Sequence, residues 1–85
     1  MKQFSHIIAD PEGIHARPAG MLVKVATGFS SKITIGKDGK DVDLKRILAV
    51  MSLGCKKDQE VIITIEGEDE EAAQEAIQSF LKENM

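Results

Sequence analysis

The pattern of apolar and polar residues changes along the chain between the periods of strands and helices. Apolar and β-branched residues predict a short strand over 4–9, and the Asp-Pro-Glu-Gly sequence at 10–13 predicts a loop. Over 16–27 the apolar residues recur at helical offsets, which indicates one buried face of a helix. Pro18 suits the first turn of this helix, where no N–H is needed, and Gly28 predicts its end.

The middle of the chain predicts a hairpin, a second helix and a further strand. Residues 32–35 alternate at period two, and 40–43 return after the glycine-containing turn 36–39, which is typical of a β-hairpin. Residues 44–53 have helical spacing before a glycine stop. The nearly continuous apolar run 61–65 predicts a strand that is covered on both faces or lies centrally in its sheet.

The last segment predicts a third helix, which begins in the acidic stretch after Gly67 and ends at about Lys82. Its apolar stripe consists of Ala73, Ala76, Ile77, Phe80 and Leu81. The resulting order is β-α-β-β-α-β-α. In so short a chain, two helical crossovers favour a single sheet with all helices packed on one face. We therefore expect one domain over residues 1–85.

Composition narrows the class of protein. With 42% apolar and 29% charged residues the chain is typical of a globular domain. No apolar run approaches the roughly 20 residues of a membrane span, and the first residues lack the apolar stretch of a secretory signal. The one cysteine, Cys55, has no partner for an internal disulfide, and we expect it to be a small buried residue. These features predict a cytoplasmic protein without direct membrane insertion.

Charge is distributed unevenly along the chain. Residues 1–57 hold ten Lys or Arg and five acids, a net charge of +5, whereas residues 58–85 hold one Lys and nine acids, a net charge of −8. The first two thirds therefore favour an acidic or phosphorylated partner. The overall charge of −3 and the absence of Trp and Tyr argue against a nucleic-acid-binding module. No cluster with metal-ligand spacing is present in the sequence.

The candidate chemistry lies in the segment Gly13-Ile14-His15-Ala16-Arg17-Pro18-Ala19. His15 is the last residue before the first predicted helix, so the free N–H groups of Ala16 and Arg17 would face an anion on its ring. Arg17 adds a permanent cation whose geometry matches phosphate oxygens. This arrangement suits a histidine that accepts and donates a phosphoryl group. The alternative is a capping or surface histidine, because no second catalytic residue lies nearby in the sequence.

The helix predicted over 44–53 has more apolar positions than one buried stripe requires. The positions that we expect in the core are Leu44, Val50 and Leu53. The positions that would remain partly outside are Ile47, Leu48 and Met51. With Lys45 and Arg46 beside them, they form a plausible docking surface for another protein. The alternative is that the helix is simply wedged into a small core.

Three segments together resemble a known family. They are the Gly13–Ala19 segment, Leu44-Lys45 followed by Met51-Ser52-Leu53-Gly54, and the closing Gly67-Glu68-Asp69-Glu70 with its amphipathic helix. The chain resembles HPr, the histidine-containing phosphocarrier family of the bacterial phosphoenolpyruvate-dependent sugar phosphotransferase system, over almost its whole length. The resemblance implies an α+β fold, an open-faced β-sandwich in which three helices cover one face of a four-stranded antiparallel sheet.

The resemblance also implies roles and partners. His15 would take a phosphoryl group from phosphorylated enzyme I on Nδ1 and pass it to a sugar-specific enzyme IIA domain, with Arg17 assisting the phosphorylated state. The chain would act as a monomeric co-substrate rather than an enzyme, without cofactor or metal. The residues implied in docking both partners are Gly20, Met21, Lys24, Arg46, Ile47, Leu48 and Met51. Of these, Gly20 and Met21 occupy positions that vary in the family.

One position departs from a pattern of the family. Many members from low-GC Gram-positive bacteria carry a regulatory serine, phosphorylated by a kinase, where this chain has Arg46. We therefore expect no regulatory serine here, and the neighbouring Ser52 does not inherit the role. The alternative function is a regulatory HPr-like protein that binds a transcription factor or enzyme without phosphoryl transfer. The presence of His15 and the absence of that serine both argue against it.

Overall fold

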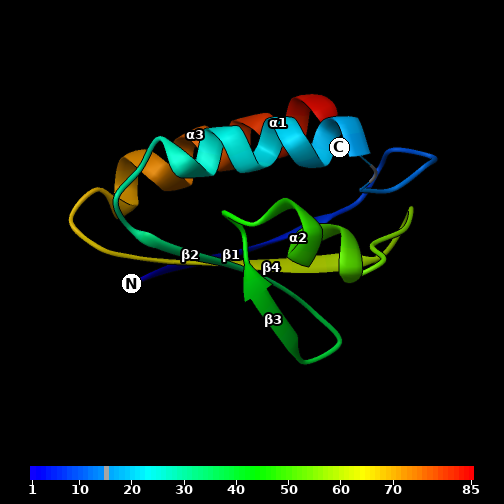
Figure 1. The fold of residues 1–85 in the computed structure, drawn as a ribbon, viewed down its shortest axis with the longest axis horizontal. Coiled ribbons are helices and arrows are strands. Elements are labelled where there is room, and N and C mark those ends of the chain that lie inside the picture. Colours follow the sequence, from blue (N-terminus) through cyan, green and yellow to red (C-terminus); the bar gives the residue numbers. More distant parts are fainter. Residues whose placement is uncertain (15) are drawn as a thin grey trace.

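The computed structural model describes residues 1–14 and 16–85, which form a sheet with helices on one side (Figure 1). The predicted order of elements and the open-faced architecture are confirmed. The elements are β1 (Lys2–Ile7), α1 (Ala16–Thr27), β2 (Lys32–Lys37), β3 (Lys40–Asp43), α2 (Ile47–Ser52), β4 (Glu60–Glu66) and α3 (Glu70–Asn84). None of the helices in the described part of the chain is long and apolar enough to cross a membrane.

The four strands pair antiparallel in the order β1-β4-β2-β3. β4 thus lies inside the sheet, as one of the two interpretations of its apolar run predicted. Only one of its faces is covered: Val61, Ile63 and Ile65 point into the core, whereas Ile62 is 41% exposed on the open face. The apolar run therefore reflects a central position in the sheet rather than coverage on both sides.

The core lies between the inner face of the sheet and the helices, with α1 and α3 side by side above the strands (Figure 1). Each helix contributes one apolar stripe, as its spacing predicts. The buried residues of α1 are Ala19, Leu22 and Ala26, and those of α3 are Ala73, Ile77 and Leu81. Phe80 is partly buried against the same cluster. α2 is short and contacts α1 and β3.

Several boundaries differ from the predictions by one to three residues. β1 runs from Lys2 to Ile7 rather than from Phe4 to Ala9, because its pairing with β4 extends from the Lys2–Ile65 pair to the Ile7–Glu60 pair. β2 extends to Lys37, since only Asp38 and Gly39 turn the chain, both with positive φ, as a type I′ hairpin turn requires. α3 continues beyond Lys82 to Asn84.

The start of α2 is the largest difference. The helix begins at Ile47 rather than at Leu44, because the backbone at Arg46 is extended (φ −120°, ψ 110°). The Asp43 carboxylate accepts the backbone N–H of Lys45 at 2.9 Å, which favours a turn at this point. Leu44 still reaches the core from this turn and is fully buried.

Candidate functional site: the loop before α1 and the face beside it

A tight turn leads the chain from β1 toward α1. The N–H of Gly13 donates to the carbonyl of Asp10 at 2.9 Å, and the N–H of Glu12 donates to the Asp10 side chain at 2.8 Å. The N–H of Ile14 donates to the carbonyl of Cys55 at 3.0 Å. This last bond fastens the turn to the loop between α2 and β4.

Gly13 is required where these two loops meet. Its φ of +71° lies in the left-handed region, and a Cβ there would overlap the Cys55 carbonyl and lie 2.8 Å from Lys56 Cα. The side chain of Ile14 is buried, with 6% of its surface exposed. The backbone immediately before position 15 is therefore held closely against residues 55–56.

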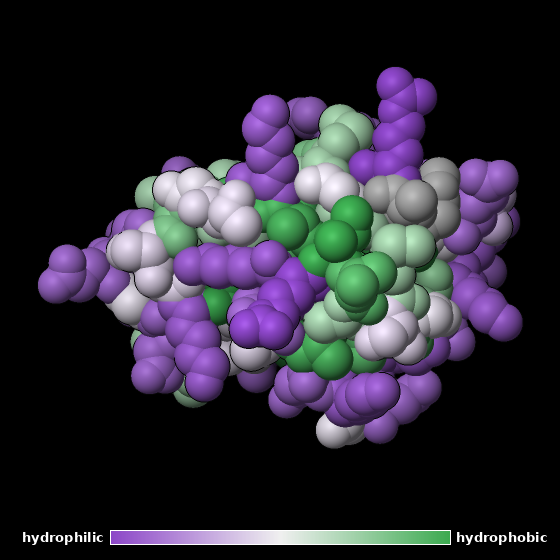
Figure 2. Space-filling model, viewed as in Figure 1, coloured by the Kyte–Doolittle hydropathy of each residue, from purple (hydrophilic) through white to green (hydrophobic). Residues whose placement is uncertain are grey.

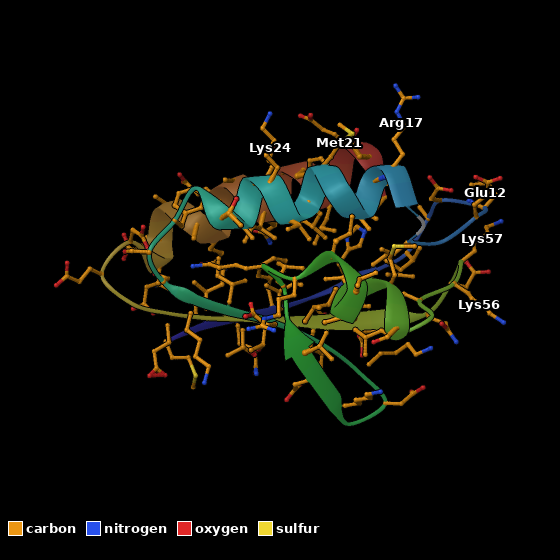
Figure 3. The ribbon with its side chains drawn as sticks, viewed as in Figure 1. Glu12, Arg17, Met21, Lys24, Lys56 and Lys57 are labelled. Carbon is orange, nitrogen blue, oxygen red and sulfur yellow. The ribbon has the colours of Figure 1, made fainter. Side chains whose placement is uncertain are left out.

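The predicted phosphoryl acceptor, His15, lies outside the described residues, as does the side chain of Ala16. The backbone of α1 begins at Ala16, as predicted, so its first N–H groups stand at this end of the molecule. The first turn of α1 contains no acidic residue that would neutralise its positive pole. The exposed side chain of Arg17 projects outward from the same turn (Figure 3).

An exposed apolar surface lies on α1 and α2, and we call it the apolar patch. Its members are Met21 (48% exposed), Ile47 (39%), Leu48 (79%) and Met51 (39%). An apolar area is visible at the centre of Figure 2. The two helices approach closely at Gly20, where a Cβ would be only 3.4 Å from Ile47 Cδ1.

The predicted division of the 44–53 segment is confirmed, because the positions expected in the core are buried and those expected outside are exposed. Leu44, Val50 and Leu53 are at most 6% exposed. The segment is therefore not wedged entirely into the core. Exposed apolar side chains of this size are typical of surfaces that bind another protein.

Basic residues around the apolar patch differ in exposure and in their hydrogen-bond partners. Lys24 is exposed on α1 (Figure 3). Arg46 Nε lies 3.8 Å from Asp43 Oδ2, but 79% of the Arg46 side chain is exposed. Lys45, in contrast, donates from Nζ to the Phe29 carbonyl at 2.7 Å and so joins the α2 region to the end of α1. Lys24 and Arg46 thus leave most of their charge at the surface.

Cys55 is buried, as the sequence predicted, with 3% of its surface exposed. Burial raises the pKa of its thiol, and the positive charge of Lys37 partly opposes that rise. A buried thiol with a raised pKa is poorly reactive at neutral pH. Within residues 1–14 and 16–85 no group of three His, Cys, Asp or Glu side chains forms a metal site.

Two side chains whose hydrogen bonds the sequence pattern does not predict hold the loops at this site and at the opposite end of α1. Lys37 donates from Nζ to the Gly54 carbonyl at 3.1 Å and to Gln59 Oε1 at 3.2 Å. Asp69 accepts the backbone N–H groups of Ser30 and Ser31 at 2.8 and 2.9 Å, and both serine hydroxyls also donate to it. These bonds join residues 17–39 positions apart, so no local motif reveals them.

Comparisons with known proteins agree with this geometry. Residues 2–83 match the family model described as the PTS HPr component phosphorylation site. The phosphocarrier protein HPr of Lysinibacillus sphaericus is 45% identical over 83 residues, which cover 98% of this chain and 94% of that protein.

The fold is also similar to those of solved HPr structures. A histidine-containing phosphocarrier protein from Mycoplasma has a TM-score of 0.93 at 41% identity, covering 96% of this chain and 93% of its own. An HPr dimer from Thermoanaerobacter tengcongensis has a TM-score of 0.78 at 40% identity, covering 98% of this chain and 95% of its own.

Proposed function

The chain belongs to the HPr family of phosphocarrier proteins, and from that membership we propose that its carrier residue is His15. In this proposal, Nδ1 of His15 bonds to the phosphoryl group as the group leaves phosphorylated enzyme I. The same bond breaks when the group passes to a sugar-specific enzyme IIA domain. The observation that carries the proposal is that the described residues of the motif, Gly13–Ile14 and Arg17–Ala19, lie before and in the first turn of α1, the helix that also carries Met21 of the apolar patch.

Electrostatics at the start of α1 supports this role. The free N–H groups of a helix N-terminus stabilise a nearby negative charge by roughly 0.3–1 kcal/mol, and more in partly buried geometries. Arg17 contributes a permanent positive charge in the first turn of α1. This turn contains no acidic residue that would repel a phosphoryl group. We propose that Arg17 and the backbone N–H groups of Ala16 and Arg17 stabilise the phosphorylated state of His15.

The apolar patch and its basic neighbours form the proposed docking surface for both partners. Gly20 allows α1 and α2 to approach, so the exposed side chains of the two helices form one surface rather than two. Met21, Ile47, Leu48 and Met51 supply apolar contact area. Lys24 and Arg46 supply exposed positive charge at its border, which favours a partner with an acidic rim.

We propose that the protein is a monomeric cytoplasmic carrier that functions as a co-substrate rather than as an enzyme. The free, buried Cys55 suits a reducing compartment. A related HPr from Thermoanaerobacter tengcongensis forms a dimer, so the monomer is tested directly by light scattering during size-exclusion chromatography. A mass of about twice 9.3 kDa would contradict it.

The chain has Arg46 where many family members carry a regulatory serine, so we propose that kinase-dependent regulation through this position is absent. A guanidinium group is not a substrate for a serine kinase, and it carries charge opposite to that of phosphoserine. Incubation with such a kinase and ATP should leave the mass unchanged. A gain of one phosphoryl group on any serine would contradict this part of the proposal.

The central test is phosphorylation by enzyme I and phosphoenolpyruvate, followed by mass spectrometry at neutral and acidic pH. We expect one acid-labile phosphoryl group on the wild-type protein and none on His15→Ala. Circular dichroism of both proteins checks that the variant remains folded. Phosphorylation that persists in His15→Ala, or an unmodified wild-type protein in the presence of active enzyme I, would overturn the proposal.

A further inference from the structure

The loop between α2 and β4 is the support against which the residues before position 15 rest. Its Cys55 carbonyl accepts the N–H of Ile14 at 3.0 Å, and Gly13 packs closely against Cys55 and Lys56. The loop is in turn fixed to the end of β1, because Asp58 N–H donates to the Ile8 carbonyl at 2.7 Å. Any displacement of this loop would therefore also displace the backbone that leads into α1.

Lys37, at the end of β2, also bonds to this loop. It leaves the end of β2, and its half-buried side chain donates to the Gly54 carbonyl at 3.1 Å and to Gln59 Oε1 at 3.2 Å. Gln59 Oε1 also accepts the backbone N–H of Lys56 at 2.8 Å. One ammonium group and one amide oxygen thus fasten both sides of the loop, before and after Cys55. We call this pair the Lys37–Gln59 clamp.

Lys37, like Lys45, donates its side-chain hydrogen bonds to neutral oxygens. Within the described residues no carboxylate lies within ion-pair distance of its Nζ, so its hydrogen bonds go to neutral oxygens of the loop. A charged donor makes stronger hydrogen bonds than a neutral one. Ordering a long lysine side chain also costs entropy, so the clamp stabilises one loop position at the expense of side-chain freedom.

We propose that Lys37, acting with Gln59, is a positioning residue for phosphoryl transfer. The clamp fixes the 54–59 loop, the Cys55 carbonyl fixes Ile14, and the backbone of Ile14 sets where the next residue begins. This inference rests on the proposed role of His15 as carrier. Transfer between two proteins depends steeply on alignment, and a misplacement of about 1 Å reduces such rates by as much as 100-fold.

The first experiment measures the clamp without any phosphoryl transfer. In Lys37→Met the aliphatic stem remains and the three N–H donors are lost. We expect hydrogen exchange of the Ile14 amide to become about tenfold faster, because its acceptor loop is released. The central β4 amides report global unfolding and should change less than the Ile14 amide. Lys40→Met is the matched control, because Lys40 is exposed on the same hairpin and this substitution removes the same charge.

The second experiment measures transfer from phosphorylated enzyme I. We expect Lys37→Met to lower kcat/KM by about 3- to 10-fold, mainly through kcat, because the residue lies outside the proposed docking surface. Lys37→Arg retains N–H donors and should restore most of the rate, whereas Lys40→Met should match the wild type. Gln59→Met should resemble Lys37→Met, and the double variant should be less impaired than the product of the single effects.

The outcomes separate the two proposals. If Ile14 exchange is the same in wild type and Lys37→Met, the clamp does not hold the loop and the inference is wrong. Equal losses of rate in Lys37→Met and Lys40→Met would mean a general charge effect and would also overturn it. A wild-type protein that enzyme I does not phosphorylate refutes the carrier role of His15, while the exchange measurement still decides whether the clamp exists.

Discussion

The two ends of α1 are held in different ways. At its C-terminal end, Asp69 accepts hydrogen bonds from Ser30 and Ser31, and Lys45 donates to the carbonyl of Phe29, so charged side chains do the fastening. At its N-terminal end, backbone bonds join the chain before position 15 to the 54–59 loop, while the charged side chain of Asp10 bonds within its own turn and that of Lys37 bonds to that loop. The charge of Arg17 remains exposed.

This difference separates stability from recognition along one helix. Charged side chains at the C-terminal end form hydrogen bonds within the protein, so a change there should alter the free energy of unfolding. Charged and apolar groups at the N-terminal end and on α2 remain exposed, and a change there should alter binding. The three variants below test whether the separation holds, and they are ordered by the size of the effect that we expect.

Met51→Asp should have the largest effect, on the binding of enzyme I. A carboxylate in the apolar patch removes an interface contact and introduces an uncompensated charge, so we expect affinity to fall by about 1–3 kcal/mol. Isothermal titration calorimetry measures this loss. Because Met51 is 39% exposed, the urea midpoint should change little. Equal affinity for wild type and variant would show that α2 does not contact the partner.

Asp69→Asn should act on stability and leave partner binding unchanged. Hydrogen bonds from Ser31 and Ser30 lower the pKa of the Asp69 carboxyl from 3.8 to about 2. A lowered pKa in the folded state means that the ionised group stabilises the fold above about pH 4, and that this contribution is lost as the pH falls toward 2. The variant should therefore melt below the wild type at neutral pH.

Thermal melts between pH 2 and 7 test this expectation. The gap in Tm between wild type and Asp69→Asn should be widest at neutral pH and should narrow as the pH falls from about 4 to 2. Glu68→Gln is the control, because it makes the same change of charge at a neighbouring exposed position. If both variants show the same pH dependence, the effect belongs to net charge and not to the bonds with Ser30 and Ser31.

Arg46→Ser should produce the smallest effect, a gain in stability. Arg46 occupies the N-cap of α2 and makes no capping bond from its side chain, whereas a serine hydroxyl accepts an N–H of the first turn. The lost ion pair with Asp43 is largely exposed and contributes only a few tenths of a kcal/mol. We expect a net gain of about 0.5–1 kcal/mol in the free energy of unfolding.

Urea denaturation compares Arg46→Ser with Arg46→Ala. Both variants lose the guanidinium group, but only serine supplies an acceptor, so any difference between them measures the cap. Equal midpoints for the two variants would show that the first turn of α2 does not need a side-chain cap. A gain in stability together with weaker binding of enzyme I would show that Arg46 contributes to recognition at the expense of the cap of α2.

Local signals in the sequence predicted most of the fold. The bounds of α1 follow from helical spacing, from Pro18 in its first turn and from Gly28 directly after it. The exposed apolar side chains of α2 were predicted because the 44–53 segment has more apolar positions than one buried stripe requires. The start of α2 was predicted three residues too early, because spacing does not reveal that Asp43 binds the backbone of Lys45 and turns the chain.

The supports of the site could not be predicted, because they join residues that are far apart in the sequence. Lys37 ends a strand and Gln59 precedes another, and neither position has a pattern that indicates a hydrogen bond between them. Asp69 lies in an acidic stretch that predicts a helix start, yet its side chain bonds the backbone beyond α1 and does not cap its own helix. Only the packed sheet and helices bring these groups together.

The sheet order has a consequence for how the protein is made. β1 precedes the other three strands in the chain, yet within the described residues it pairs with β4 alone, and the pairing joins Lys2 to Ile65. A chain still growing on the ribosome therefore cannot complete its sheet until most of its residues have emerged. Closing so long a loop is slow relative to local pairing such as the β2–β3 hairpin. We expect the first strand to join last, with its apolar side unprotected during translation.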